Sequence, residues 1–386
     1  MTERERAYAL LERIERESLY ATLALQNESG FVRTLVLGVL RWRSRLDFVI
    51  ASLSDRPLRK LDPAVVGVLR IGIYQLLYMN VASHAAVAET VELAGRHASR
   101  ARGFVNAVLR RATRESIPEP ADLATKTAHP AWLIARWTEF YGAERAQRIA
   151  EANQELSTPD ILVLGGDPPT GAIHSRLVGG VWKVAGSTAD LDRNRFYPMD
   201  EGSAVVAATA AATAREVLDL AAAPGGKSLY LRHQGVDVIS NDVSFARLIP
   251  LAGRGGKIVV SDGTRPPFSV PFDCVLLDAP CSATGTNRKN PELKWRLREE
   301  DLPAFSAQQA KLLAASATLT RRWCVYATCS LEREENDAVI ADPHFAKRDI
   351  TPFVPEGARG WVEEGVLRLT PESGADGFTV FLLERK

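Results

Sequence analysis

Hydrophobic residues recur at helical spacing through the first third of the chain. Apolar side chains follow this spacing between Ala7 and Ile14 and again between Phe31 and Leu40, as they do on the buried face of an amphipathic helix. Asp62 followed by Pro63 is typical of an N-cap and a first helical turn. The pattern therefore predicts a compact all-α bundle over residues 1–118.

The pattern changes after the sequence Ile117-Pro-Glu-Pro120. Helical spacing resumes over residues 130–153 and gives way to short β-like runs at 161–164 and 181–185, which glycines and prolines separate. We expect residues 119–197 to form a helical linker and a small α+β subdomain.

From residue 198 onward, strand-like and helix-like segments alternate. An Ala-rich helix at Gly202–Ala214 comes first. The predicted strands are Glu216–Leu220, Val236–Ser240, Lys257–Ser261, Phe272–Leu277, Trp323–Ala327 and Phe378–Glu384. Such alternation predicts an α/β domain over residues 198–386, with a mostly parallel sheet and helices on both faces.

Two of these strands end in polar loops that carry cysteines. Asp278 and Cys281 follow the fourth strand, and Cys329 follows the fifth. Ligands bind at the carboxyl ends of strands in open α/β sheets, so these side chains predict thiolate chemistry at that edge. The other two cysteines, Cys274 and Cys324, lie inside strands and are expected to be buried small hydrophobes. No pair has C-x-x-C spacing, so we expect free thiols and no metal site.

The turn after the first predicted strand, Asp219–Ser228, is rich in small residues. Its alanines and two glycines let the backbone approach a ligand before a helix begins. A nucleotide P-loop at Ala221–Ser228 is one hypothesis, although the strict motif is not met and Pro224 would stiffen the loop. A dinucleotide fold is a second, but its G-x-G-x-x-G motif is absent.

S-adenosylmethionine (SAM) is the third hypothesis and explains more of the sequence. Asp242 ends the next strand, where a carboxylate can hold two ribose hydroxyls. Asp262 follows the strand after that, where it can accept from an adenine amine, and Asp278 follows the fourth. An acid at the end of each successive strand, together with the Gly-rich turn, favours a class I methyltransferase.

The composition is that of an ordinary globular protein, with 46% hydrophobic and 25% charged residues. No apolar run approaches the roughly 18 residues of a membrane span, and the charged N-terminus lacks a signal-peptide core. We therefore expect a cytoplasmic protein without membrane contact. Residues 1–118 carry 18 Lys and Arg against 12 Asp and Glu, and this excess predicts either nucleic-acid binding or simply a solvated helical surface.

Several motifs resemble a known family. The strings DLAAAPGGKS, LLDAPCSATGT and VYATCS resemble the SAM-binding and catalytic motifs of the NOL1/NOP2/Sun RNA (cytosine-5)-methyltransferases. LGVLRWRSRLD, LRIGIYQLLYMN, HAAVAETVELA and GFVNAVLRR resemble the NusB-like domain fused to bacterial rRNA cytosine methyltransferases. The resemblance covers nearly the whole chain except roughly residues 155–195. It implies a multidomain protein with a NusB-like bundle, the small subdomain and a Rossmann-like class I methyltransferase domain.

The resemblance also implies an activity and its residues. The activity is SAM-dependent methylation at C5 of a specific cytosine in 16S rRNA. Cys329 matches the nucleophile that attacks C6, Cys281 the cysteine that assists release, and Asp278 an acid between SAM and the base. The implied cofactor contacts are Ala221, Ala222, Ala223, Pro224, Gly225, Gly226, Lys227, Asp242, Asp262 and Asp278. A cysteine is usual in the family where Ala221 stands. Gly-Gly usually precedes the strand of the nucleophile, but this chain has Thr320–Trp323 there, so we expect that turn to differ.

The implied partner is 16S rRNA, free or in a partly assembled small subunit, and we expect a monomer. Candidate phosphate contacts are Arg41, Arg43, Arg45, Arg110 and Arg111. The basic, aromatic stretch Thr286–Arg298 is a candidate for gripping RNA beside the site.

Three alternatives remain open at this stage. A DNA cytosine-C5 methyltransferase would use Cys281 as its nucleophile. A non-catalytic NusB-like assembly factor would bind RNA but not SAM. An NTPase would use Ala221–Ser228 and would require Mg-dependent ATP binding.

Overall fold

The computed structural model describes residues 1–386. The chain folds into two compact units. The helical unit contains Met1–Glu155 together with Asn290–Arg296, and the sheet unit contains Leu156–Lys289 together with Leu297–Lys386.

The helical unit confirms the predicted all-α bundle. Its helices are α1 (Glu3–Arg16), α2 (Ala21–Ala24), α3 (Gly30–Leu53), α4 (Pro63–Tyr78), α5 (Ser83–His97), α6 (Arg102–Ala112), α7 (Leu123–Lys126), α8 (Ala131–Tyr141), α9 (Ala143–Ala152) and α13 (Leu293–Arg296). The first six pack around one apolar core, which includes Leu35 and Leu69. The predicted cap of α4 is confirmed, because Asp62 Oδ1 accepts the Ala64 N–H at 2.8 Å.

A small antiparallel sheet opens the sheet unit. Its strands are β1 (Asp160–Val163), β2 (Ile173–His174), β3 (Val181–Lys183) and β4 (Phe196–Pro198), in the order β2-β3-β1-β4. Ile161, Val184 and Phe196 form its own small apolar cluster.

The large sheet has nine strands. They are β5 (Glu216–Asp219), β6 (Asp237–Asp242), β7 (Lys257–Val260), β8 (Phe272–Asp278), β9 (Thr320–Thr328), β10 (Phe345–Arg348), β11 (Val362–Glu363), β12 (Val366–Leu369) and β13 (Phe378–Arg385). The order is β11-β12-β13-β9-β8-β5-β6-β7, and β10 also pairs with β13. Strands β5 to β9 are parallel to one another. Strands β10 to β13 pair in antiparallel fashion, and β13 joins them to β9.

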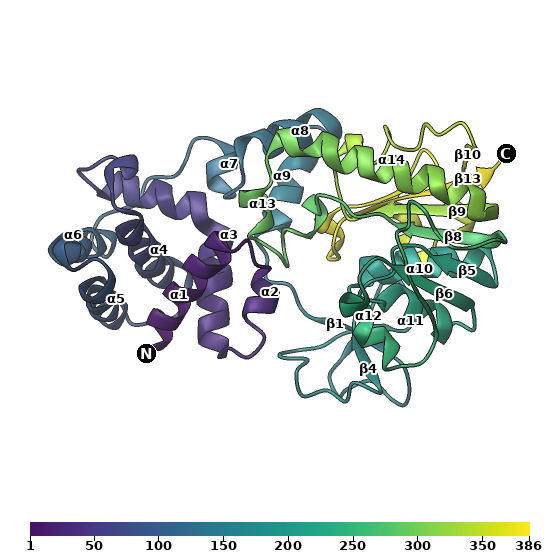
Figure 1. Ribbon diagram of the computed structural model, residues 1–386. Coiled ribbons are helices and arrows are strands. Elements are labelled where there is room, and N and C mark those ends of the chain that lie inside the picture. Colours follow the sequence, from purple (N-terminus) through teal and green to yellow (C-terminus); the bar gives the residue numbers. More distant parts are fainter. The chain divides into compact units, whose positions relative to one another are not determined.

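Helices cover both faces of this sheet (Figure 1). They are α10 (Glu201–Thr213), α11 (Gly226–His233), α12 (Phe245–Ala252) and α14 (Leu302–Leu319). Side chains along β8 alternate between the two faces, as the strand period requires. Cys274 and Leu276 belong to the core shared with α10 and α11, whereas Val275 and Leu277 pack in the core that contains Leu312 of α14. The buried run in the sequence therefore reflects a strand covered on both sides.

The structure departs from the sequence predictions in several places, which include the short strands β2 and β4 of the small sheet. The antiparallel strands β10 to β12 were not predicted, because they are only two to four residues long. Thr320–Trp323, expected to replace a turn, is the first part of β9. The helical pattern over residues 130–153 is two helices, which Gly142 separates with a φ of +80°.

Close packing of α3 against α4 depends on Gly38. A Cβ at this position would overlap the buried ring of Tyr74. We expect Gly38→Ala to destabilise the protein by about 1–3 kcal/mol in urea unfolding, because a packed ring must shift. Gly103→Ala is the matched control, since Gly103 lies in α6 with open space around its Cα, and alanine should add up to ~1 kcal/mol there. Equal unfolding midpoints for the two variants would contradict this packing.

Candidate active site

The order of the parallel strands reverses beside β5. The chain passes from β5 to β6 and β7 on one side, and later returns to β8 and β9 on the other. Ligands of open α/β sheets bind at this kind of switch point, outside the carboxyl ends of the strands. Asp219 ends β5 and Asp278 ends β8, so both carboxylates stand at the edge where a ligand is expected.

Asp219 hydrogen-bonds to the first turn of α11, which directly follows the first βα turn. It is 1% exposed, and its Oδ2 accepts the Ser228 hydroxyl at 2.6 Å, which in turn accepts the Ser240 hydroxyl at 2.8 Å. Its Oδ1 is buried without a hydrogen-bond partner. Burial, which disfavours the charged carboxylate, raises the pKa of Asp219 to about 7.

The turn itself brings backbone close to neighbouring groups. Gly225 has a φ of +106°, and a Cβ there would lie 2.6 Å from Leu251 Cβ, so only glycine suits the position. The peptide bond between Ala223 and Pro224 is cis. The Ala223 N–H donates to Asp242 Oδ2 at 3.0 Å, which joins the turn to the end of β6.

The carboxylates after β6 and β7 differ in their surroundings. Asp242 is 6% exposed and also accepts the Ser244 N–H at 2.9 Å. Asp262 is more open and accepts the Thr264 N–H at 2.9 Å and its hydroxyl at 2.7 Å. These bonds to Thr264 lower the pKa of Asp262. Both side chains lie at the sheet edge where the sequence placed them.

Lys227 joins the first turn to the fourth strand. Its Nζ lies 2.6 Å from Asp278 Oδ2. Burial by itself lowers the pKa of an ammonium group, but the charges of Asp278 and Asp219 outweigh burial and raise the pKa of Lys227. Lys227 therefore stays protonated near neutral pH, beside the partly exposed Asp278 carboxylate.

The side chains of the two loop cysteines, Cys281 and Cys329, are in contact. Cys281 Sγ lies 3.2 Å from Cys329 Sγ, and both are free thiols. The hydrogen bond with Cys329, then burial, raises the pKa of Cys281 well above its ordinary value, and Glu335 and Asp278 add to the shift. Cys274 and Cys324 are fully buried as predicted, and burial raises the pKa of Cys274 to about 12.

Backbone bonds hold the two cysteine loops against each other. The Gly285 N–H donates to the Cys329 carbonyl at 2.9 Å, and the Leu331 N–H donates to Thr284 Oγ1 at 2.9 Å. A Cβ on Gly285 would lie 2.9 Å from the Cys329 carbonyl oxygen, so glycine permits this close approach.

Glu335 is a buried residue of the site that the sequence analysis missed. Its carboxylate accepts hydrogen bonds from Ser282 and Ser330, each of which directly follows one of the two loop cysteines. The available signal was an acidic residue six positions after Cys329. In a segment rich in charged residues, that signal predicts a solvated loop.

Comparisons with known proteins identify the family of this chain. The family model for 16S rRNA methyltransferase RsmB/F matches residues 207–383, and the NusB family model matches residues 1–114. Ribosomal RNA small subunit methyltransferase B of Thermus thermophilus is 33% identical, over 98% of this chain and 94% of its own length. This chain belongs to the RsmB/F methyltransferase family. Probable ribosomal RNA small subunit methyltransferase B of Bacillus subtilis is 29% identical, over 99% of this chain and 98% of its own.

The fold of this RsmB/F family member matches a solved structure throughout. The crystal structure of PH0851 superposes with a TM-score of 0.78 at 23% identity, covering 100% of this chain and 99% of that one. Family membership makes the chain a SAM-dependent RNA methyltransferase. None of its helices has the length and apolar character needed to cross a bilayer.

The site suits the cofactor of the RsmB/F family. The turn of Ala221–Lys227 carries only small side chains before Lys227, so its backbone is open to approach by a ligand. The unpartnered Asp219 Oδ1 lies beneath this turn. Carboxylates at the ends of β6 and β8 add acceptors suited to the hydroxyls and amines of SAM.

Two of the predicted RNA-contacting arginines of this RsmB/F family member are buried. Arg41 is 4% exposed and Arg45 is 9% exposed, with Arg45 paired to Glu119 at 3.0 Å. A buried guanidinium is not presented to an RNA phosphate, so these two predictions were wrong. Arg110 and Arg111 are more open, and Arg111 pairs with Glu115 at 2.8 Å.

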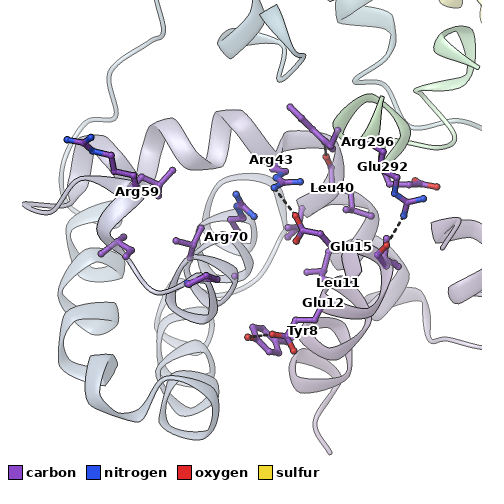
Figure 2. A pocket seen from close by; sticks show the side chains of 18 of the residues that line it. Tyr8, Leu11, Glu12, Glu15, Leu40, Arg43, Arg59, Arg70, Glu292 and Arg296 are labelled. Atoms are coloured by element: carbon purple, nitrogen blue, oxygen red, sulfur yellow. Dashed lines mark hydrogen bonds and ion pairs between the residues drawn. The ribbon is translucent and has the colours of Figure 1, made fainter. Parts of the chain in front are cut away.

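Arg43 lines a cavity of about 880 Å³ within the helical unit. Figure 2 shows Arg43 beside Glu15, with Arg70 nearby and Tyr8 and Leu11 lower in the same cavity. Arg43 pairs with Glu15 at 2.8 Å. Burial, and then the charge of Arg70, lower the pKa of Arg43. Arg70 likewise pairs with a carboxylate, that of Asp47 at 2.7 Å, so both cations of this cavity already have an anionic partner.

Three residues of the stretch predicted to grip RNA make hydrogen bonds or ion pairs within the protein. Trp295 Nε1 donates to the Leu40 carbonyl at 2.6 Å, and the buried Lys294 Nζ donates to the Arg41 carbonyl at 3.1 Å. Lys289 lies in the sheet unit and contacts the carboxylates of three aspartates there, Asp160, Asp200 and Asp376. The ammonium groups of Lys289 and Lys294 are occupied within the protein, so the predicted phosphate contacts by these two residues were wrong.

The raised pKa of Asp219 predicts a pH-dependent stability. The folded-state pKa is about 7, against roughly 4 for an unfolded aspartate. Between these values the folded protein holds a proton that the unfolded chain has released, so the free energy of unfolding falls as pH rises. Asp219→Asn mimics the protonated form and removes this loss.

We expect the melting temperature of Asp219→Asn, relative to wild type, to increase from pH 5 to pH 8. Each 1 kcal/mol relieved corresponds to roughly 2–4 °C in a domain of this size. Asp337→Asn is the control, because Asp337 is a surface carboxylate paired with Arg368. A difference between Asp219→Asn and wild type that does not change with pH would contradict the assignment.

Proposed function

We propose that this protein methylates C5 of a cytosine in 16S rRNA through a covalent bond between Cys329 and C6. The observation that carries the proposal is the 3.2 Å separation of the Cys281 and Cys329 sulfurs at the carboxyl ends of adjacent strands. Asp278 lies at the end of the same strand that leads to Cys281.

Cytosine C5 is too weak a nucleophile to take a methyl group unaided. Attack of the Cys329 thiolate on C6 forms a sulfur–carbon bond and leaves an enamine, which makes C5 nucleophilic. SAM, when bound, supplies the methyl group that C5 takes. Loss of the C5 proton and departure of the Cys329 thiolate then restore the aromatic ring.

In this proposal Cys281 assists the departure of Cys329. Its raised pKa keeps it a thiol at neutral pH, and its sulfur is within hydrogen-bond reach of the Cys329 sulfur. A thiol at this place stabilises the leaving thiolate by donating to it. Asp278 and a water are the two candidates for the base that removes the C5 proton.

The SAM contacts that we propose are Ala221, Ala222, Ala223, Pro224, Gly225, Gly226, Lys227, Asp242, Asp262 and Asp278. They all lie on the turn after β5 or at the ends of β6, β7 and β8. Lys227 and Asp278 form an ion pair, so one end of the proposed SAM site is tied to the catalytic strand.

Relatives named ribosomal RNA small subunit methyltransferase B support 16S rRNA as the substrate. We propose that residues 1–118 bind RNA, with Arg43, Arg110 and Arg111 as the remaining phosphate contacts. Residues 119–197 would then be a linker and subdomain, residues 198–386 the catalytic domain, and the protein a monomer. The target is either free rRNA or a partly assembled small subunit, so both are used as substrates below.

The roles of Cys281 and Cys329 are tested by trapping the covalent protein–RNA intermediate. Wild type, Cys281→Ala and Cys329→Ala are incubated with 16S rRNA or small-subunit particles and labelled SAM, then separated on a denaturing gel. We expect Cys281→Ala to accumulate a protein–RNA adduct, because release is impaired, and Cys329→Ala to form none and to lose methyl transfer.

Other outcomes of the trapping experiment point to the rivals. An adduct that depends on Cys281 would reverse the two roles and favour the mechanism of DNA cytosine-C5 methyltransferases. No adduct and no methyl transfer from wild type on either substrate would overturn the proposed reaction and favour a binding factor.

The proposed SAM contact at Asp242 is tested by calorimetry. We expect Asp242→Ala to raise the Kd for SAM by roughly 10–100-fold, the loss of about 1.5–3 kcal/mol for hydrogen bonds to a charged group. Asp237→Ala is the control, because Asp237 begins the same strand but pairs with Lys257 at an exposed position. An unchanged Kd for a folded Asp242→Ala would remove Asp242 from the site.

A further inference from the structure

A carboxylate lies buried directly behind the two cysteine loops. Glu335 is fully buried and ends the short 3₁₀ turn Arg333–Glu335 after β9. Its backbone is fixed as well, because the hydroxyl of Tyr326 in β9 donates to its carbonyl at 2.6 Å.

The Glu335 carboxylate accepts four hydrogen bonds. Oε2 accepts the Ser282 N–H at 2.8 Å and Gln309 Nε2 at 2.9 Å. Oε1 accepts the Ser330 hydroxyl at 2.6 Å and also the Ser282 hydroxyl. Burying a carboxylate is costly unless hydrogen bonds satisfy it, and these four donors supply that stabilisation from three separate segments.

The donors are placed around the reacting thiols. Ser282 follows Cys281 in the chain, and Ser330 follows Cys329. Gln309, on α14, donates through the same nitrogen to the Pro280 carbonyl at 2.9 Å, so the backbone is held on both sides of Cys281. The two serine hydroxyls also lie 3.1 Å from each other. Glu335 thus ties the loop of one cysteine to the loop of the other.

We propose that Glu335 is a positioning residue that sets the distance between Cys281 and Cys329. This inference rests on the proposed function, in which one thiol must assist the departure of the other. Groups that support reacting atoms need to hold them within a fraction of an ångström. A carboxylate with three hydrogen bonds to the two loops and a fourth to Gln309 of α14 provides that rigidity, because each bond restricts the others.

The charge of Glu335 has a second consequence for Cys281. It adds to the effects of Cys329 and burial that raise the pKa of Cys281. The same residue therefore favours the thiol form of Cys281 while holding it beside Cys329.

Substitutions separate the hydrogen bonds from the charge. Glu335→Ala removes all four bonds. Glu335→Gln keeps a carbonyl oxygen for the Ser282 N–H and Gln309, while its amide can donate to the two serine hydroxyls, which turn to accept. Asp337→Ala is the matched control, since it removes a carboxylate two residues away that pairs with Arg368.

The first measurement is the rate at which Cys281 and Cys329 form a disulfide, which reports on the distance between the two thiols. It needs neither RNA nor SAM. One equivalent of hydrogen peroxide oxidises the Cys281 and Cys329 thiols to a disulfide and is itself reduced to two waters. Peptide mapping follows the rate of formation of this disulfide. We expect Glu335→Ala to form the disulfide about tenfold or more slowly than Glu335→Gln, which loses the same charge but keeps the hydrogen bonds, and Asp337→Ala to stay within about twofold of wild type.

The second measurement is methyl transfer to 16S rRNA or subunit particles. We expect Glu335→Ala to lower kcat by ~10–100-fold, because misplacement by about 1 Å costs this much, with the KM for SAM unchanged. Glu335→Gln should recover most of kcat. A wild-type disulfide rate in folded Glu335→Ala would overturn the positioning role, and so would equal losses in Glu335→Ala and Glu335→Gln.

Two further arms keep the result interpretable. If Glu335→Ala does not fold, the double variant Ser282→Ala with Ser330→Ala removes the hydroxyl donors and leaves the carboxylate, and it should slow disulfide formation in the same direction. If wild type transfers no methyl group, the proposed function fails, whereas the disulfide rates still decide whether Glu335 sets the distance between the thiols.

Discussion

The pairing of β8 with β9 is the constraint on which the site depends. The two strands run parallel, with Asp278 opposite Ala327, so both chains leave the sheet at the same edge. Cys281 lies three residues beyond one strand and Cys329 one residue beyond the other. Parallel strands lie about 4.8 Å apart, and short loops that start from such neighbours can bring two sulfurs into contact without long flexible segments.

A strand pair of this kind is stable only when both faces are covered. The alternation of Cys274 and Leu276 with Val275 and Leu277 meets this requirement, because helices pack on each face. The apolar interior of the sheet holds the strands firmly, and the polar chemistry is confined to their ends. Glu335 and Asp219 extend polar groups a short way into this interior, where hydrogen bonds fix their positions.

The sequence predicted the parts of the fold that local pattern controls. The buried runs of β5, β6, β8 and β9, and the helical spacing of the N-terminal bundle, are periodic signals that a window of residues contains. The cysteines and aspartates at strand ends followed from the same pattern. The antiparallel strands β10 to β12 were missed because so few residues give no period. Their place in the sheet comes from pairing, of β10 and β12 with β13 and of β11 with β12.

Errors arose where a polar side chain is buried by non-local contacts. Lys294 and Trp295 looked like surface groups for RNA, yet their donors meet backbone carbonyls of α3, about 250 positions earlier in the chain. Glu335 looked like part of a charged loop, yet its acceptors meet serines of two loops. Composition predicts that a charged residue is exposed, and only the tertiary structure supplies the partners that reverse this.

The charged groups near the two cysteines also differ. Cys281 experiences the negative charges of Glu335 and Asp278, which disfavour its thiolate. Lys227, by contrast, has its pKa raised in part by Cys329, so a positive charge lies within electrostatic range of that sulfur. The raised pKa of Cys281 keeps a proton on that sulfur. A thiol 3.2 Å from the Cys329 sulfur is the arrangement that the proposed release step requires.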